Sequence, residues 1–153
     1  MVHKRVRFNL KPGDIIQLPV RPSGFAFAKY TPEHSYAFYK LISPTDKVPS
    51  NAELVNSGVM FRIFVMDRPV KEGEWKVVGY GEVENDLLRP QKYFIQDAIR
   101  ENNFEIYEEP NRRPATRDEC KGLECYAVWS QNHVEDRIED YLNKRPCKWV
   151  EAI

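Results

Sequence analysis

The chain has 153 residues, of which 42% are hydrophobic and 30% are charged, and its 23 basic and 23 acidic side chains leave a formal net charge of zero. This composition excludes disordered and fibrous chains, and no stretch reaches the run of about 18 apolar residues that spans a membrane. The basic start also lacks the apolar run of a secretory signal. We therefore predict one cytoplasmic domain over residues 1–153, in which residues 1–10 are a basic N-terminal segment that can be flexible.

The first half of the chain predicts short strands. Aromatic and β-branched residues recur in runs that are bounded by Pro, Gly or Ser, which is typical of strands in a sheet. These runs cover residues 15–20, 24–30, 35–42, 59–66 and 74–81. The first three predict a meander because they are close in sequence, and the fourth predicts a central strand because both of its faces are apolar. The polar region 43–57, with Pro44 and Pro49, predicts a loop.

The second half mixes helices with strands. Pro90 suits a first helical position and apolar residues then recur at helical spacing, so we predict a helix over residues 91–100. Strands are predicted at 104–108 and 123–130, an edge strand at 148–153, and a helix with an acidic outer face at 132–143. Residues 108–119 predict a loop in which Thr116 caps a short helical turn together with Glu119.

The order of these elements predicts the fold class. It is α+β: a β-rich single domain, built as a curved antiparallel sheet or barrel with two or three short helices. No internal repeat or low-complexity tract interrupts this pattern.

The cysteines and histidines raise the question of a metal site or a catalytic thiol. Cys120 and Cys125 lie close together, but His133 and Cys147 are too far apart to form the second close ligand pair of a zinc site. Cys125 alternates with apolar residues, which predicts a thiol turned toward the core. We predict no catalytic residue, no metal and no cofactor, and a hydrolase with a Cys/His pair stays as an alternative.

Charge is distributed unevenly along the chain. Residues 1–49 hold eight basic and three acidic side chains, whereas residues 101–143 hold five basic and eleven acidic ones. An acidic surface attracts a basic partner and speeds association. The basic start favours a second hypothesis, a nucleic-acid-binding barrel module, although a pI of about 6.8 disfavours a nucleic-acid partner. The residues of this alternative are Lys4, Arg5, Arg7, Lys11, Arg21 and Lys29.

The order of several short stretches resembles a known family. The stretches are KPGDIIQLPV, GFAFAKY, FRIFVMD, EWKVVGYG and CKGLECYAVWS, followed by an acidic helix. This order is similar to the immunity protein 26 family of bacterial polymorphic toxin and contact-dependent inhibition systems, over about residues 10–145. The resemblance implies a small cytoplasmic protein that binds the C-terminal domain of a cognate toxin, often a nuclease, and blocks it without performing chemistry.

The candidate toxin-binding residues come from the charge and aromatic pattern alone. We expect an acidic rim around aromatic anchors on a protein that acts as a monomer, because tight interfaces combine these two features. The candidates are Glu108, Glu109, Glu119, Glu124, Glu135, Asp136, Glu139, Asp140, Tyr107 and Tyr126. Because aromatic residues at strand spacing normally face inward, a core position for these tyrosines is the competing interpretation.

Overall fold

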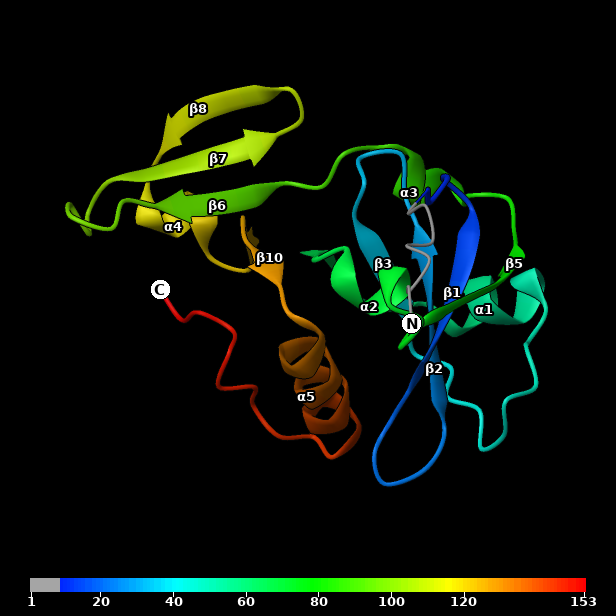
Figure 1. Ribbon diagram of the computed structural model, residues 1–153. Coiled ribbons are helices and arrows are strands. Elements are labelled where there is room, and N and C mark those ends of the chain that lie inside the picture. The colour runs from blue at the N-terminus through cyan, green and yellow to red at the C-terminus, as the bar shows by residue number, and fades with distance from the viewer. Residues whose placement is uncertain (1–8) are drawn as a thin grey trace, which may run out of the picture.

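The computed structural model describes residues 9–153, so the predicted basic residues Lys4, Arg5 and Arg7 lie outside the described part of the chain. Its strands form two sheets with the helices around them (Figure 1), which confirms the β-rich α+β class. The larger sheet contains β1 (Asp14–Pro19), β2 (Phe25–Tyr30), β3 (Tyr36–Tyr39), β4 (Val59–Val65), β5 (Lys76–Tyr80) and β10 (Val128–Trp129). The smaller sheet contains β6 (Tyr93–Gln96), β7 (Phe104–Glu108), β8 (Asn111–Ala115) and β9 (Glu124–Cys125). The helices are α1 (Asn51–Ser57), α2 (Arg68–Lys71), α3 (Asn85–Leu88), α4 (Arg117–Cys120) and α5 (Gln131–Leu142).

The larger sheet has the strand order β10-β4-β3-β2-β1-β5. Strands β1 to β3 form the predicted antiparallel meander, β4 extends it, and β5 returns to pair with β1 on its open side. At the other edge, β10 pairs with β4 in parallel, because the chain returns to it from the smaller sheet. The first two strands join through Gly24, whose φ of 126° lies in a region that side chains other than glycine rarely adopt.

Both faces of the larger sheet are covered, which explains the nearly continuous apolar runs in its strands. One face carries Ile16, Ala28 and Phe38, and it packs against residues Val134 and Ile138 of α5. The opposite face carries a second cluster of buried residues, formed by Ile15, Phe27, Tyr39 and, from α1, Leu54. A fully buried residue such as Leu54 contributes about 1.5–3 kcal/mol to folding relative to an exposed one.

The smaller sheet has the order β8-β7-β6-β9 and also has two distinct faces. Phe94, Phe104 and Ile106 pack together with Cys120 of α4 on one face. Tyr93 and Tyr107 are partners in register and point to the other face, since side chains alternate along a strand. Only residues 126–127 separate β9 in this sheet from β10 in the larger one, so the predicted strand 123–130 is divided between two sheets.

The predicted helix over residues 91–100 is wrong. Residues Tyr93–Gln96 form strand β6 instead. The apolar spacing was a misleading indication of a helix, because Ile99, which would have completed its apolar face, is 92% exposed. Asp97 ends the strand: its Oδ1 accepts hydrogen bonds from the backbone N–H groups of Ile99 and Arg100, each at 2.8 Å. Tyr93, Phe94 and Ile95 are residues that favour strands, and the neighbours β7 and β9 supply the pairing.

Other boundaries also differ from the prediction. The loop predicted at 43–57 contains α1, whose first turn is capped by the Ser50 hydroxyl accepting from the Glu53 N–H. The loop predicted at 108–119 contains β8, but its capping box of Thr116 and Glu119 at the start of α4 is confirmed. The edge strand predicted at 148–153 is wrong, because that segment contains only a turn and irregular backbone.

Candidate protein-interaction surface

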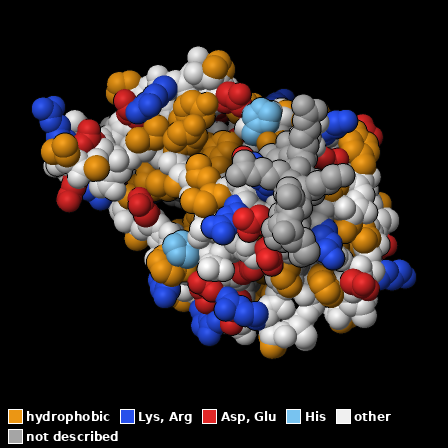
Figure 2. Space-filling view, viewed as in Figure 1, with side chains coloured by type: hydrophobic (Ala, Val, Ile, Leu, Met, Phe, Trp, Pro, Cys, Tyr) orange, Lys and Arg blue, Asp and Glu red, His pale blue; other side chains and the backbone are white. Residues whose placement is uncertain are grey.

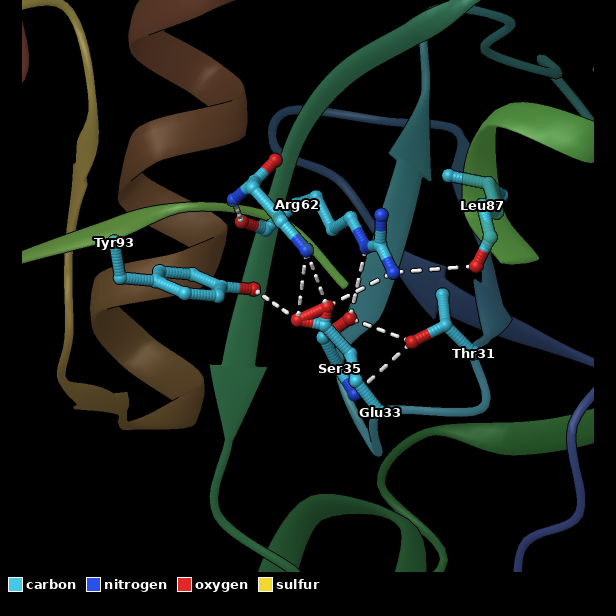
Figure 3. Close-up of polar contacts among 7 residues, drawn as sticks. Thr31, Glu33, Ser35, Arg62, Leu87 and Tyr93 are labelled. Atoms are coloured by element: carbon cyan, nitrogen blue, oxygen red, sulfur yellow. Dashed lines mark hydrogen bonds and ion pairs between the residues drawn. The ribbon is translucent and has the colours of Figure 1, made fainter. Parts of the chain in front are cut away.

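A buried ion pair joins the turn between β2 and β3 to the middle of β4. Arg62 Nη2 lies 2.8 Å from Glu33 Oε2, and their side chains are only 6% and 2% exposed. Arg62 also donates from Nε to the Ser35 hydroxyl at 3.1 Å and from Nη2 to the Leu87 carbonyl at 3.2 Å (Figure 3). These bonds compensate the cost of burying the guanidinium group. Such burial is tolerated only when the charge is paired and the N–H donors have acceptors.

The same pair reaches the smaller sheet. The Tyr93 hydroxyl donates to Glu33 Oε1 at 2.9 Å, and the Gln91 backbone N–H donates to Oε2 at 3.1 Å. Gln91 Nε2 donates in turn to the Arg62 carbonyl at 2.8 Å. Burial and the adjacent Glu33 carboxylate raise the pKa of Tyr93, which therefore stays a hydrogen-bond donor. The segment that leads into the smaller sheet is thereby fixed to the larger one.

Four aromatic rings meet where the two sheets join, and we call them the aromatic junction: Phe64, Tyr93, Tyr107 and Tyr126. The Tyr107 and Tyr126 ring centroids are 4.5 Å apart. Tyr126 also meets Phe64 edge to face at 5.6 Å, and Phe64 lies 5.0 Å from Tyr93. Because Tyr93 is held by Glu33, the ring cluster has a rigid base.

The aromatic junction reaches the molecular surface. Tyr126 is 44% exposed, and the apolar side chains of Met66 and Val128 beside β4 and β10 are 48% and 60% exposed. Val128 pairs in register with Phe64, so both point to the same side of the larger sheet. In the space-filling view, hydrophobic side chains gather over β6, the end of β7 and β10 (Figure 2). Exposed apolar side chains gathered in this way make the surface a candidate interaction site.

Glu109 lies close to Tyr107 of the aromatic junction, whereas Glu108 alternates with Tyr107 along β7 and points to the opposite face of the smaller sheet. Glu108 ends β7 and Glu109 follows in the turn to β8, and both are exposed. Burial, the Tyr126 hydroxyl and the Glu109 carboxylate raise the pKa of Tyr107. Within residues 9–153, neither Glu108 nor Glu109 forms an ion pair with a basic side chain. The structure thus brings three of the predicted residues together: Tyr107, Glu109 and Tyr126.

Comparison with known protein families identifies the chain. A model of the family described as Immunity protein 26 matches residues 11–105. The chain belongs to the immunity protein 26 family. The matched region runs from the turn before β1 to the start of β7 and includes Phe64 and Tyr93 of the aromatic junction. Comparison with curated proteins and with solved structures found no match.

The other predicted acidic residues of this immunity protein lie elsewhere, and most are paired with arginines. Arg21 contacts Asp136 and Glu139, and Arg145 contacts Glu139 and Asp140, so the outer face of α5 is largely neutralised. Glu124 pairs with Arg137, and Glu119 pairs with Arg113. Glu135 is partly buried and accepts a hydrogen bond from Gln131, and burial raises its pKa. Most of these carboxylates are therefore already in contact with arginines of the same chain.

The basic residues of the nucleic-acid alternative do not form a surface in the described part. Lys29 is fully buried: its Nζ donates to the Asn51 side chain at 2.5 Å and to the Glu82 carbonyl at 2.8 Å, and it pairs with Glu84 at 3.1 Å. Its assignment to a nucleic-acid-binding surface is therefore wrong. Lys11 is exposed. Arg21 is occupied by α5, which leaves Lys11 as the free member of this set within residues 9–153.

The cysteines and histidines have structural surroundings. Cys120 is buried among the apolar residues beside α4. Cys125 and His133 line a hollow of about 500 Å³ between the β9–β10 segment and the C-terminal tail (Figure 2). Burial and the neighbouring Glu151 raise the pKa of Cys125 to about 12, which keeps the thiol protonated and unreactive. The His133 ring stacks on Trp149 at 3.7 Å.

No three His, Cys, Asp or Glu side chains within residues 9–153 are grouped as metal ligands would be. No helix in the same range is long and apolar enough to cross a membrane.

Proposed function

We propose that this immunity protein binds the C-terminal domain of a cognate bacterial toxin in the cytoplasm and neutralises it as a non-catalytic, one-to-one inhibitor. Membership of the immunity protein 26 family is the observation that carries the proposal. The raised pKa of Cys125 agrees with a mode of action that relies on binding, because a nucleophilic thiol must be deprotonated.

The aromatic junction and the adjacent Glu109 are the proposed contact surface. Tyrosine is enriched among the few residues that supply most of the energy of a protein interface, and rigid anchors lose little entropy on binding. Tyr126 is half-exposed, and its ring neighbours are fixed through Tyr93 to the buried ion pair. A nuclease is one class of toxin that suits this surface, since its phosphate-binding cleft is basic and attracts acidic side chains.

Co-expression tests the proposed function. The toxin domain encoded by the neighbouring gene would be induced in cells with and without the immunity protein, and growth would be recorded. We expect protection from the wild-type protein and a stable one-to-one complex by size-exclusion chromatography with light scattering. Toxicity that is unchanged by the immunity protein, together with the absence of a complex, would refute the proposal.

A further inference from the structure

We infer that the open strand edge at residues 124–129 is the docking site for an extended segment of the toxin. The bound segment takes the place of residues 147–153 of the immunity protein, which we call the covering segment. This inference rests on the proposed function and adds to it the form of the partner at one contact. It is carried by the unpaired edge, by the hollow along it, and by the weak attachment of the covering segment.

Residues 124–129 form an edge that crosses from the smaller sheet to the larger one. Within the described part of the chain, β9 pairs only with β6, and β10 pairs only with β4. Both strands therefore have one unpaired side. An exposed strand edge of this kind attracts the backbone of another extended segment.

The direction of the backbone groups along this edge follows from the bonds on its paired side. The Tyr126 N–H donates into β6, and the Trp129 carbonyl accepts from the residue after β4, each at 2.9 Å. Because backbone groups alternate in direction along a strand, those of Cys125 and Val128 point to the unpaired side. Within residues 9–153, no backbone group donates to or accepts from them there.

A hollow of about 500 Å³ lies along the edge and gives room for a bound segment. Cys125 and Val128 line it on one side, and residues 149–153 line it on the other. A second hollow, of about 470 Å³, lies between the covering segment and the side chains of Phe61 and Tyr141. The covering segment thus fills the space beside the edge only in part, although protein interiors are normally close-packed.

The covering segment follows α5 and runs back toward the smaller sheet (Figure 1), but side chains alone attach it. Its one backbone hydrogen bond within the described residues is internal, from the Val150 N–H to the Cys147 carbonyl at 3.2 Å. Trp149 donates from Nε1 to Asp136 at 3.0 Å, yet the residue is 37% exposed. Ile153 packs against the apolar cluster of the smaller sheet. A segment with so few buried contacts and no backbone pairing opens at low cost, so a partner can displace it.

The groove suits an extended segment with apolar side chains. Outward backbone groups of an edge are satisfied by an added strand, whereas a helix would cover the Val128 N–H without supplying an acceptor, which is unfavourable. The covering segment shows which side chains fit. The Trp149 ring stacks on His133, and Ile153 packs against the cluster that contains Phe94. We expect the toxin segment to place an aromatic and an aliphatic side chain at these two positions.

The edge is continuous with the proposed contact surface. Tyr126 of the aromatic junction lies within residues 124–129, and Val128 is exposed two positions further along. A toxin that covers the aromatic junction therefore lies next to the edge. This continuity favours the toxin over a second copy of the chain as the source of the docked segment.

Hydrogen exchange followed by mass spectrometry tests the inference in the wild-type protein. When the toxin domain encoded by the neighbouring gene is added, residues 124–129 should exchange at least about tenfold more slowly, because new hydrogen bonds protect the outward N–H groups. The covering segment should gain no protection, since it leaves the groove. Residues 76–80 are the internal control, because β5 is the other edge of the larger sheet.

Substitutions at Val128 test the backbone contact. Val128→Pro removes the outward N–H and retains the pairing with β4, because proline is tolerated in an edge strand whose N–H faces outward. Val128→Ala also loses the valine side chain but keeps the N–H, so it is the matched control. We expect Val128→Pro to weaken the Kd for the toxin domain by about tenfold more than Val128→Ala does. Circular dichroism would confirm that both variants retain the wild-type fold.

Substitution of Trp149 tests the displacement. Trp149→Ala removes the stacking on His133 and the bond to Asp136, so the covering segment is released before the toxin binds. The toxin then no longer competes with it, and the Kd should tighten by about threefold or more. Trp149→Phe keeps a ring that stacks on His133, and its Kd should lie between those of wild type and Trp149→Ala.

The outcomes distinguish the inference from the proposed function. If the wild type binds the toxin and protects cells, but residues 124–129 gain no protection from exchange and Val128→Pro binds as Val128→Ala does, the docking site is refuted and the proposed function stands. Weaker binding by Trp149→Ala, or protection of the covering segment in the complex, would make that segment part of the contact and overturn the inference. If the wild type neither binds nor protects, both fall. Self-association of the wild type that slows exchange at residues 124–129 without toxin would assign the edge to a second copy of the chain and also overturn the inference.

Discussion

Substitution of Glu33 tests whether the buried ion pair fixes the two sheets together. Glu33→Gln keeps the shape of the side chain and an oxygen that can accept from Tyr93, but it leaves the Arg62 guanidinium without a counter-charge. Both partners are almost fully buried, at 6% and 2% exposure, so water cannot replace the lost carboxylate. Removing one partner of a buried pair costs about 3–5 kcal/mol, which for a chain of this length lowers the melting temperature by about 6–20 °C.

Urea unfolding, followed by tryptophan fluorescence, would measure this change in the free energy of unfolding. The matched control is Glu72→Gln in the pair between Arg68 and Glu72, which has side-chain exposures of 78% and 52% and should contribute less than about 0.5 kcal/mol. The double variant Glu33→Gln and Arg62→Met should lose less than the sum of the two single variants, since neither charge is then left alone. A loss for Glu33→Gln that is no larger than that of the control would refute the reasoning.

Three further predictions concern other parts of the molecule. Thr116→Ala should lower the free energy of unfolding by about 0.5–2 kcal/mol, because the Thr116 hydroxyl caps α4 by accepting from the Glu119 N–H at 3.2 Å. Thr116→Ser should retain wild-type stability. An unchanged urea midpoint for Thr116→Ala would contradict the cap. Cys125, with its pKa raised to about 12, should be alkylated slowly at pH 7 and faster as the pH rises, and alkylation at the rate of a free thiol in the native protein would contradict this. The Trp149 indole N–H and Arg21 lower the pKa of Asp136, so the folded protein binds this proton more weakly than the unfolded chain. Asp136 should therefore stabilise the fold at pH values above its ordinary pKa of about 3.9 and lose that contribution as the pH falls through the lowered value, and a stability difference between wild type and Asp136→Asn that does not shrink in acid would disprove it.

Patterns that depend on neighbours in sequence predicted their elements well. The alternation in residues 59–66 placed β4 at a central position, and the spacing of Val134 and Ile138 placed α5 within one residue of its start. The capping box at Thr116 was also recognisable, because its two hydrogen bonds join residues only three apart. These signals are local, and the tertiary structure reinforces them.

The failures involve partners that are distant in the chain. The helix predicted at 91–100 became β6 because β7 and β9 pair with it, and no local pattern contains that pairing. The prediction placed Lys29 on a basic surface. Lys29 shares one face of β2 with Phe25 and Phe27, however, and this pattern already indicated a buried position. Arg62 is likewise a charged residue within an apolar strand, β4, which indicates burial. Its partner Glu33 is identified only by the fold.

The candidate surface shows the same division. Glu109, Tyr107 and Tyr126 were candidates from the sequence, but their proximity was not predicted, because it depends on β6 pairing with both β7 and β9. The pairing of α5 carboxylates with Arg21 was also hidden, since these residues are separated by more than a hundred positions: 115 for Arg21 and Asp136.

The link of residues 126–127 between β9 and β10 has a mechanical consequence. Because this connection is so short, sliding or rotation of one sheet against the other would displace Tyr126. The Tyr126 N–H donates to the Phe94 carbonyl at 2.9 Å, and this bond would be broken. Loosening of the contact between the sheets would therefore displace the Tyr126 ring as well, so the two changes are one event.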